Sequence, residues 1–217
     1  MTSFPDPVVL RRGSDDPAAP VVVLLHGRGA DEASIIGLVD HLPAGPSYVA
    51  VRAPIAEGGG YAWFANRGIG RPVAASLAET MAWFRTWLDA EHPEGSEGSD
   101  RSGARPVVLV GFSGGAAFAG GLVLAQPGRF AGAAILHGTL PFDAGVPVTP
   151  GRLSGVPVFV AQGDADRVIP RELLDATWAY LTGEAGSVAT TWRDAGGHGV
   201  SAGAVAALGE WLVGLSG

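Results

Sequence analysis

The chain contains no cysteine and no lysine, so all fourteen of its basic residues are arginines. Without thiols, a cysteine nucleophile, a disulfide and a thiolate metal site are all excluded. Without a lysine amine, Schiff-base chemistry, attachment of pyridoxal phosphate and a Walker A phosphate loop are excluded too. Covalent chemistry in this chain would have to use mainly Ser, Thr, Asp, Glu or His.

Positive charge is also scarce, and the formal net charge is −7. This balance disfavours nucleic acid as a partner, because phosphate contacts need a basic face. No run approaches the roughly 20 apolar residues of a membrane span. The polar segment Met1 to Pro7 does not have the pattern of a targeting segment. We therefore expect a cytoplasmic protein without a membrane span, and its oligomeric state, a homodimer included, stays open.

Length and hydrophobicity favour one domain that covers residues 1–217. Hydrophobic residues make up 47% of the 217 residues, enough for one packed core. From His92 to Pro106, however, the sequence has no large apolar residue. We interpret residues 92–106 as a mobile polar surface loop inside the domain. His92 at its start and His41 at the end of a helix are expected on the surface.

Short apolar runs alternate with amphipathic segments, and this alternation indicates the fold class. Buried strands are predicted at Val21 to Leu25, Tyr48 to Val51, Val107 to Val110, Ala133 to Leu136, Val158 to Ala161 and, more weakly, Val188 to Trp192, with an edge strand at Val8 to Leu10. Helices are predicted around Ile35 to Leu42, around Leu77 to Leu88 after a capping box of Ser76 and Glu79, after Ser113, and at Arg171 to Leu181 and Ser201 to Leu215. The pattern predicts an α/β protein whose mostly parallel central sheet has helices on both faces.

A candidate nucleophile follows the apolar strand at Val107 to Val110. Gly111-Phe112-Ser113-Gly114-Gly115 has the pattern G-x-S-x-G and leads into a small-residue run suited to a helix. In the α/β-hydrolase fold this pattern places the serine on a sharp strand-to-helix turn, where glycines avoid side-chain clashes. Ser113 is therefore predicted to be an exposed nucleophile on that turn.

A serine hydroxyl needs a base, and the base needs a group that orients it. Among five histidines, His198 lies after the last predicted strand and before the last helix, where this fold places its base. The acid should lie between Ser113 and His198 in the chain, and both Asp164 and Asp166 follow a strand end. Spacing alone leaves these two carboxylates as alternatives.

Acyl transfer also needs donors for an oxyanion. The N–H of Gly114 is one candidate, and the glycine-rich turn at Leu24 to Asp31, after an early strand, offers the other. His137 ends the strand before the acid strand and could border the pocket as a substrate contact. Its alternative is a buried structural histidine.

These pieces together resemble the phospholipase/carboxylesterase family of small α/β-hydrolases, which includes acyl-protein thioesterases. The matching segments are Leu25-His26-Gly27-Arg28-Gly29, Trp63-Phe64, Gly111 to Gly115, Gly163 to Pro170 and Gly197-His198. The resemblance implies that Asp166 is the catalytic carboxylate and that the backbone N–H groups of Arg28 and Gly114 form the oxyanion hole. It also implies that Trp63 and Phe64 lie near the pocket; core packing is the alternative.

The chain departs from many family members at Gly114, where Gln is common, and at His137, where small residues are common. Arg28 stands where acyl-protein thioesterases often have an apolar residue. Its guanidinium could bind a carboxylate or phosphate of the substrate, or it could pair with Asp31 or Glu32.

The combined prediction is a serine carboxylic ester hydrolase with the triad Ser113, His198 and Asp166. It would act on a small-molecule ester through an acyl-enzyme, without a cofactor or metal. A thioesterase or lysophospholipase would use the same triad, and a serine peptidase is disfavoured because no extra domain gates peptides. The alternative from another class is a non-catalytic binding module with a hydrolase fold.

Overall fold

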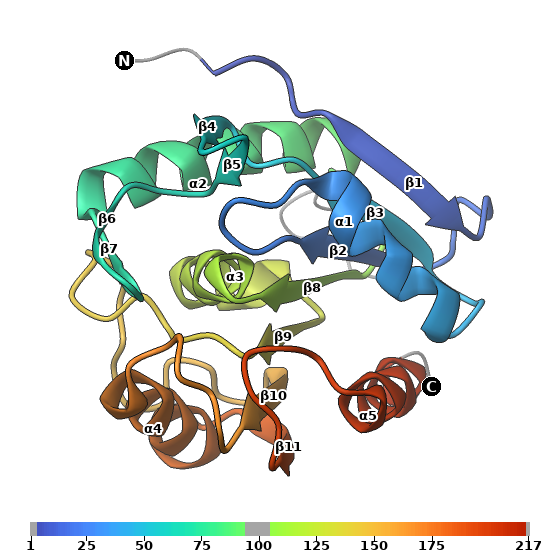
Figure 1. Cartoon of the computed structure of the whole chain (residues 1–217). Helices are drawn as coiled ribbons and strands as arrows, with labels where there is room; N and C mark the ends of the chain where they lie inside the picture. The colour runs from blue at the N-terminus through green and yellow to red at the C-terminus, as the bar shows by residue number, and fades with distance from the viewer. Residues whose placement is uncertain (1–3, 94–104, 216–217) are drawn as a thin grey trace.

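The computed structural model describes residues 4–93 and 105–215, and it contains a central sheet of seven strands (Figure 1). The strand order is β1-β3-β2-β8-β9-β10-β11, and every pairing is parallel except that of β1 with β3. The strands are β1 Val9–Gly13, β2 Val21–Leu25, β3 Ser47–Val51, β8 Val107–Phe112, β9 Gly132–Leu136, β10 Pro157–Gly163 and β11 Val188–Asp194. The predicted mostly parallel sheet is confirmed, with β1 at its edge.

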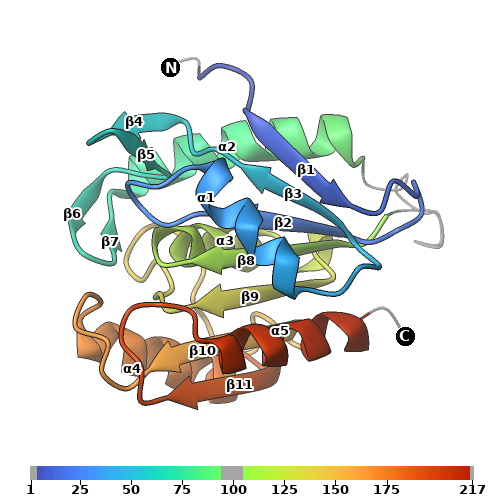
Figure 2. The same ribbon diagram turned by 45° about the vertical axis from the view of Figure 1, so that its right-hand side comes forward.

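Helices cover both faces of this sheet, as predicted (Figure 2). One face carries α1 Glu32–Ile36, the 3₁₀ helix η1 Gly37–His41 and α5 Ala202–Gly214, and the other carries α2 Ala74–Glu91, α3 Gly114–Ala125 and α4 Arg171–Ala179. The strand β2 shows why two layers are needed, because all five of its apolar side chains are buried. Val21, Val23 and Leu25 pack on the side of α2 and α3, and the alternate residues pack on the side of α5.

Two short hairpins between β3 and α2 were not predicted. They are formed by β4 Ile55–Glu57 with β5 Gly60–Ala62, and by β6 Asn66–Gly68 with β7 Arg71–Pro72. The first hairpin also bridges Ala30 through Tyr61. The remaining short elements are the 3₁₀ helix η3 Pro127–Arg129 and the π-helix η4 Tyr180–Glu184, which extends α4.

Two local predictions were wrong. The helix α2 begins at Ala74, and the Ser76 hydroxyl accepts from the backbone N–H of Ala65 at 2.9 Å instead of capping the helix. His92 is buried rather than on the surface, with 6% of its area exposed. Because α2 continues to Glu91, His92 is the residue that ends the helix, and its ring packs edge-on against Trp87.

The predicted mobile loop at residues 92–106 falls mostly on residues 94–104, which lie outside the described residues. The assignment of residues 1–217 to a single domain likewise stays a prediction. Within residues 4–93 and 105–215, no helix is both long and apolar enough to cross a membrane. The same parts of the chain contain no group of three or more His, Asp or Glu side chains that could hold a metal ion.

Candidate active site

Ser113 occupies the sharp turn between β8 and α3. Its backbone has φ 54° and ψ −113°, a region of positive φ that residues with a side chain rarely adopt. Its N–H donates to the Leu136 carbonyl at 2.9 Å. A Cβ atom on Gly111 would lie 2.2 Å from the Gly115 carbonyl oxygen. A Cβ atom on Gly115 would lie 2.1 Å from the Leu25 carbonyl oxygen. The motif needs these two glycines because the turn packs directly on itself and on β2.

His198 connects Ser113 to Asp166. The Nε2 atom of His198 lies 2.9 Å from Ser113 Oγ, and its Nδ1 atom lies 2.8 Å from Asp166 Oδ2. The three residues come from the turn after β8, the loop after β10 and the loop between β11 and α5. These loops follow the carboxyl ends of parallel strands, so the sheet brings together side chains that are far apart in the sequence.

The Asp166 carboxylate is held as an acceptor. Burial by itself would raise its pKa, but hydrogen bonds from His198, Val168 N–H and Ile169 N–H outweigh burial and lower the pKa below its usual value. The two backbone bonds to Oδ1 measure 2.8 and 3.1 Å. Asp164, the alternative left open by spacing, is instead half exposed and lies 3.7 Å from Arg193. The structure thus places Asp166, not Asp164, against His198.

Sequence reasoning missed Asp194, which closes the loop that carries His198. Its Oδ1 accepts from Gly196 N–H at 2.8 Å, and its Oδ2 accepts from Trp192 Nε1 at 3.0 Å and from the Ser201 hydroxyl. These hydrogen bonds, that of Ser201 first, lower the pKa of Asp194. Ser201 also caps α5, so one carboxylate ties the end of β11 to the start of the next helix. No local sequence signal distinguishes Asp194 from an ordinary turn residue.

The backbone N–H groups of Arg28 and Gly114 lie side by side. A Cβ atom on Gly114 would stand 3.3 Å from the nitrogen of Arg28. Within the described residues no acceptor takes either N–H group. The loop that carries Arg28 is fixed by hydrogen bonds between Gly29 N–H and the Tyr61 carbonyl at 2.9 Å, and between Tyr61 N–H and the Ala30 carbonyl at 3.0 Å. Two backbone N–H groups without an acceptor among the described residues therefore belong to neighbouring residues that both line the cavity at Ser113.

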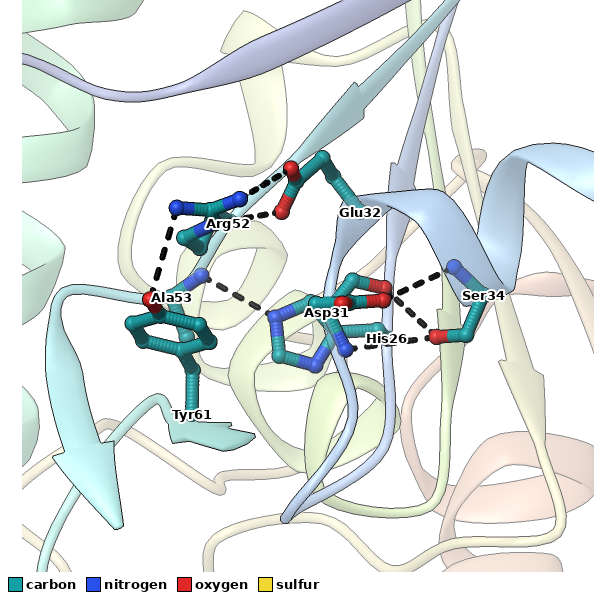
Figure 3. Close-up of polar contacts among 7 residues, drawn as sticks. All are labelled: His26, Asp31, Glu32, Ser34, Arg52, Ala53 and Tyr61. Carbon is teal, nitrogen blue, oxygen red and sulfur yellow. Dashed lines mark hydrogen bonds and ion pairs between the residues drawn. The ribbon is translucent and has the colours of Figure 1, made fainter. Parts of the chain in front are cut away.

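A polar network that includes His26, Glu32 and Arg52 lies beside this loop (Figure 3). The buried His26 donates from Nδ1 to the Gly27 carbonyl at 2.8 Å and accepts at Nε2 from Ala53 N–H at 3.0 Å. Burial lowers its pKa, so it serves as a neutral structural link. Glu32 is paired with Arg52, whose hydrogen bonds lower the pKa of that carboxyl.

The Arg28 side chain pairs with Glu57, so the alternative in which it pairs with Asp31 or Glu32 was wrong. Arg28 Nε lies 2.6 Å from Glu57 Oε1, and Nη2 donates to Oε2. A third hydrogen bond of 3.1 Å runs from Nη1 to the Phe64 carbonyl. Asp31 is engaged in the capping box of α1 and Glu32 in its pair with Arg52, so neither is available.

A cavity of about 580 Å³ opens at Ser113. Its wall is mainly apolar, with Phe64, Phe112, Ile35, Ile69, Val168 and Ile169. Of the three predicted substrate contacts, Phe64 lines the cavity, whereas Trp63 and His137 are not among its lining residues. Trp63 stacks on Phe118 at 4.5 Å between ring centres, and its Nε1 donates to the His26 carbonyl. His137 is fully buried, and burial lowers its pKa.

The comparisons with known proteins identify the family of this chain. The family model of phospholipases and carboxylesterases matches residues 10–212. The protein MhqD of Bacillus subtilis (strain 168) is 26% identical over 190 residues, covering 88% of this chain and 89% of its own length.

Solved structures give the same result for the fold. The Bacillus cereus carboxylesterase superposes with a TM-score of 0.79 at 23% identity, covering 96% of this chain and 94% of that one. The carboxylesterase from Mesorhizobium loti superposes with a TM-score of 0.75 at 24% identity, covering 97% of this chain and 100% of that one. The resemblance noted in the sequence is thereby confirmed: this chain belongs to the phospholipase/carboxylesterase family of hydrolases.

Proposed function

We propose that this protein is a serine carboxylic ester hydrolase that forms an acyl-enzyme on Ser113. The observation that carries the proposal is the continuous hydrogen-bonded chain from Ser113 Oγ through His198 to Asp166. A nucleophile, a base within reach and a buried carboxylate that orients the base are the parts required for acyl transfer. Family membership supports the same reaction class.

In the proposed reaction, Ser113 Oγ attacks the ester carbonyl while His198 Nε2 takes the hydroxyl proton. The negative charge that develops on the carbonyl oxygen is stabilised by the N–H groups of Arg28 and Gly114. Collapse of the tetrahedral intermediate breaks the ester C–O bond, and His198 returns its proton to the leaving alcohol. A water molecule, deprotonated by His198, then hydrolyses the acyl-enzyme, releases the carboxylic acid and restores Ser113.

The cavity supports a small-molecule substrate. Its volume of about 580 Å³ is in the range of small-ligand sites, and its aromatic and aliphatic wall suits a hydrocarbon chain. Asp166 supports the mechanism through its ionised carboxylate, which holds the Nδ1 proton of His198 and leaves Nε2 free to accept from Ser113.

The test combines kinetics with covalent labelling. We expect a burst of p-nitrophenol from p-nitrophenyl acetate and a stoichiometric adduct with a fluorophosphonate, located by peptide mapping on Ser113. Ser113→Ala should lose the burst, the adduct and turnover, by up to about 10⁶-fold. Because Ala is smaller, it should preserve the fold, and circular dichroism with thermal unfolding checks this.

Ser34 provides an internal control, since it lines the same cavity but its hydroxyl donates to the Asp31 carbonyl at 2.6 Å. The adduct should be absent from the peptide that contains Ser34. Labelling there, or turnover of more than a few per cent in Ser113→Ala, would contradict the assignment of the nucleophile. A protein that binds esters but shows neither burst nor adduct would instead be a binding module.

A further inference from the structure

Most polar side chains in the wall of the cavity already have partners inside the protein. His26 links Gly27 to Ala53, and Arg28 is held by Glu57. The Ser34 hydroxyl donates to Asp31, and the Thr139 hydroxyl bonds Thr177 at 3.0 Å. Ser113 and His198 bond each other. These groups either belong to the catalytic machinery or serve the fold.

Asn66 is different. It lines the cavity, and no described residue bonds either polar atom of its amide. The Oδ1 atom is buried without a hydrogen-bond partner among these residues, whereas Nδ2 keeps accessible surface and is the amide atom open to a ligand. Asparagine in a hairpin or turn normally uses its side chain to bond nearby backbone. A buried amide oxygen without a donor is unfavourable, because it has lost water and gained nothing in return.

The backbone around Asn66 is firmly placed, so the free amide is not explained by a loose segment. Asn66 pairs with Pro72 across the β6–β7 hairpin. The residue before it, Ala65, donates to the Ser76 hydroxyl at 2.9 Å and accepts from Val73 N–H at 2.7 Å. These contacts anchor the hairpin to the start of α2 and hold the amide at the cavity wall.

The charge balance of the cavity points to a neutral polar group as the partner. Among the lining residues that the structure describes, Arg28 is the one with a guanidinium, and Glu57 neutralises it. A carboxylate on the substrate chain would enter an apolar wall without a free cation to pair with. A hydroxyl group suits the amide better, because it both donates and accepts. It can bond Asn66 whichever way the amide is turned.

We propose that Asn66 is a specificity-determining residue that hydrogen-bonds a hydroxyl group on the substrate chain, so that hydroxy esters are preferred over plain esters of the same length. This inference rests on the proposed function. The hydroxyl could lie on the acyl chain or on the alcohol, and the two are distinguished by the choice of substrates.

The test compares catalytic efficiency within matched pairs of esters. For the acyl side, ethyl hexanoate is compared with its β-hydroxy and ε-hydroxy derivatives, and for the alcohol side, propyl butyrate with hydroxyethyl butyrate. In Asn66→Leu, the ratio of kcat/KM for a hydroxy ester to that for its plain partner should fall about 3- to 10-fold, the effect of one neutral hydrogen bond. Plain esters make no bond to the amide, so the change in their kcat/KM should be smaller than that of their hydroxy partners.

Two further variants sharpen the result. Asn66→Ala should lower the same ratio, which guards against misfolding of the leucine variant. Arg67→Gln is the matched control on the same strand, because Arg67 is exposed and does not line the cavity. It should leave every ratio unchanged. A fall confined to one side of the ester would identify where the hydroxyl sits.

Equal changes for hydroxy and plain esters on both sides would overturn the role of Asn66 while leaving the proposed function intact. If the wild type hydrolysed no ester, the proposed function would fail by itself. The inference would then be decided by calorimetric binding of the same esters to Ser113→Ala, with and without Asn66→Leu. A binding preference for hydroxy esters that disappears with Asn66→Leu would still support it, and the absence of that preference would refute it.

Discussion

Arg28 and Glu57 form a two-pronged ion pair that joins the loop after β2 to the β4–β5 hairpin. Arg28 is also the residue whose backbone N–H we propose as an oxyanion donor. Arg28 also donates to the Phe64 carbonyl, so one guanidinium connects three segments around the cavity. The side chain thus acts as a brace for the loop, and its charge is already compensated.

This pairing predicts that Arg28→Leu will not change selectivity for charged substrates. The ratio of kcat/KM for monoethyl succinate to that for ethyl butyrate should change less than about 2-fold, because the guanidinium is occupied by Glu57. Both rates should fall together by a few-fold, since a partly exposed pair contributes about 0.2–1 kcal/mol to holding the loop. A loss confined to the succinate ester would show that Arg28 binds substrate carboxylates.

The two aspartates after β10 should differ sharply in their effect on catalysis. Asp166→Asn removes the acceptor that holds the Nδ1 proton of His198, and a similar change in another triad cost about 10⁴-fold in kcat. Asp164→Asn, at an exposed position near Arg193, should change kcat by less than about 3-fold. Steady-state kinetics of the two variants decide the matter, and the reverse ranking would show that the orienting residue is misassigned.

Asp194 should act as a positioning residue for His198. Asp194→Ala removes three hydrogen bonds that close the histidine loop, so we expect kcat to fall about 10- to 100-fold while KM changes little. Labelling of Ser113 by a fluorophosphonate should slow in parallel, because the base is misplaced. Asp164→Ala is the control at the end of the neighbouring strand. Unaltered kcat and labelling in Asp194→Ala would mean that the loop holds its shape without this carboxylate.

Buried histidines should make stability depend on pH in the mildly acidic range. Burial lowers the pKa of His26, His92 and His137 in the folded state, whereas the unfolded chain has values near about 6.5. Below pH ~6.5 the unfolded state therefore binds more protons. The free energy of unfolding is then highest above that pH and falls as pH drops towards the folded pKa values.

The contribution of one histidine can be isolated with His92→Leu. His92 Nε2 is buried without a partner within the described residues, so leucine sacrifices no hydrogen bond of that atom. Urea unfolding between pH 5 and 7.5 gives the free energy of unfolding at each pH. The slope of this free energy against pH should be smaller than in the wild type by up to about 1.4 kcal/mol per pH unit. His41→Gln, at an exposed position, is the control. An unchanged slope in His92→Leu would contradict the buried neutral state of His92.

The sequence alone determined the features that depend on local sterics and on continuous hydrophobic runs. Val21 to Leu25 is apolar at every position, so it had to become a strand covered on both faces. Likewise the glycines around Ser113 indicated a tight strand-to-helix turn, and the close contacts at Gly111 and Gly115 leave no room for a side chain there. Chain order then limited the base and acid to a few residues near the ends of later strands.

Only the tertiary structure decided which polar groups meet. The partner of Arg28 is Glu57 because a hairpin of three-residue strands, too short for a clear hydrophobic pattern, folds beside the loop after β2. The packing of segments remote in the sequence also leaves the amide of Asn66, at the cavity wall, without a partner among the described residues. It buries Trp63, whose Nε1 donates to the His26 carbonyl. Polar pairing depends on distances between segments remote in the sequence, whereas hydrophobic patterning is already complete within each segment.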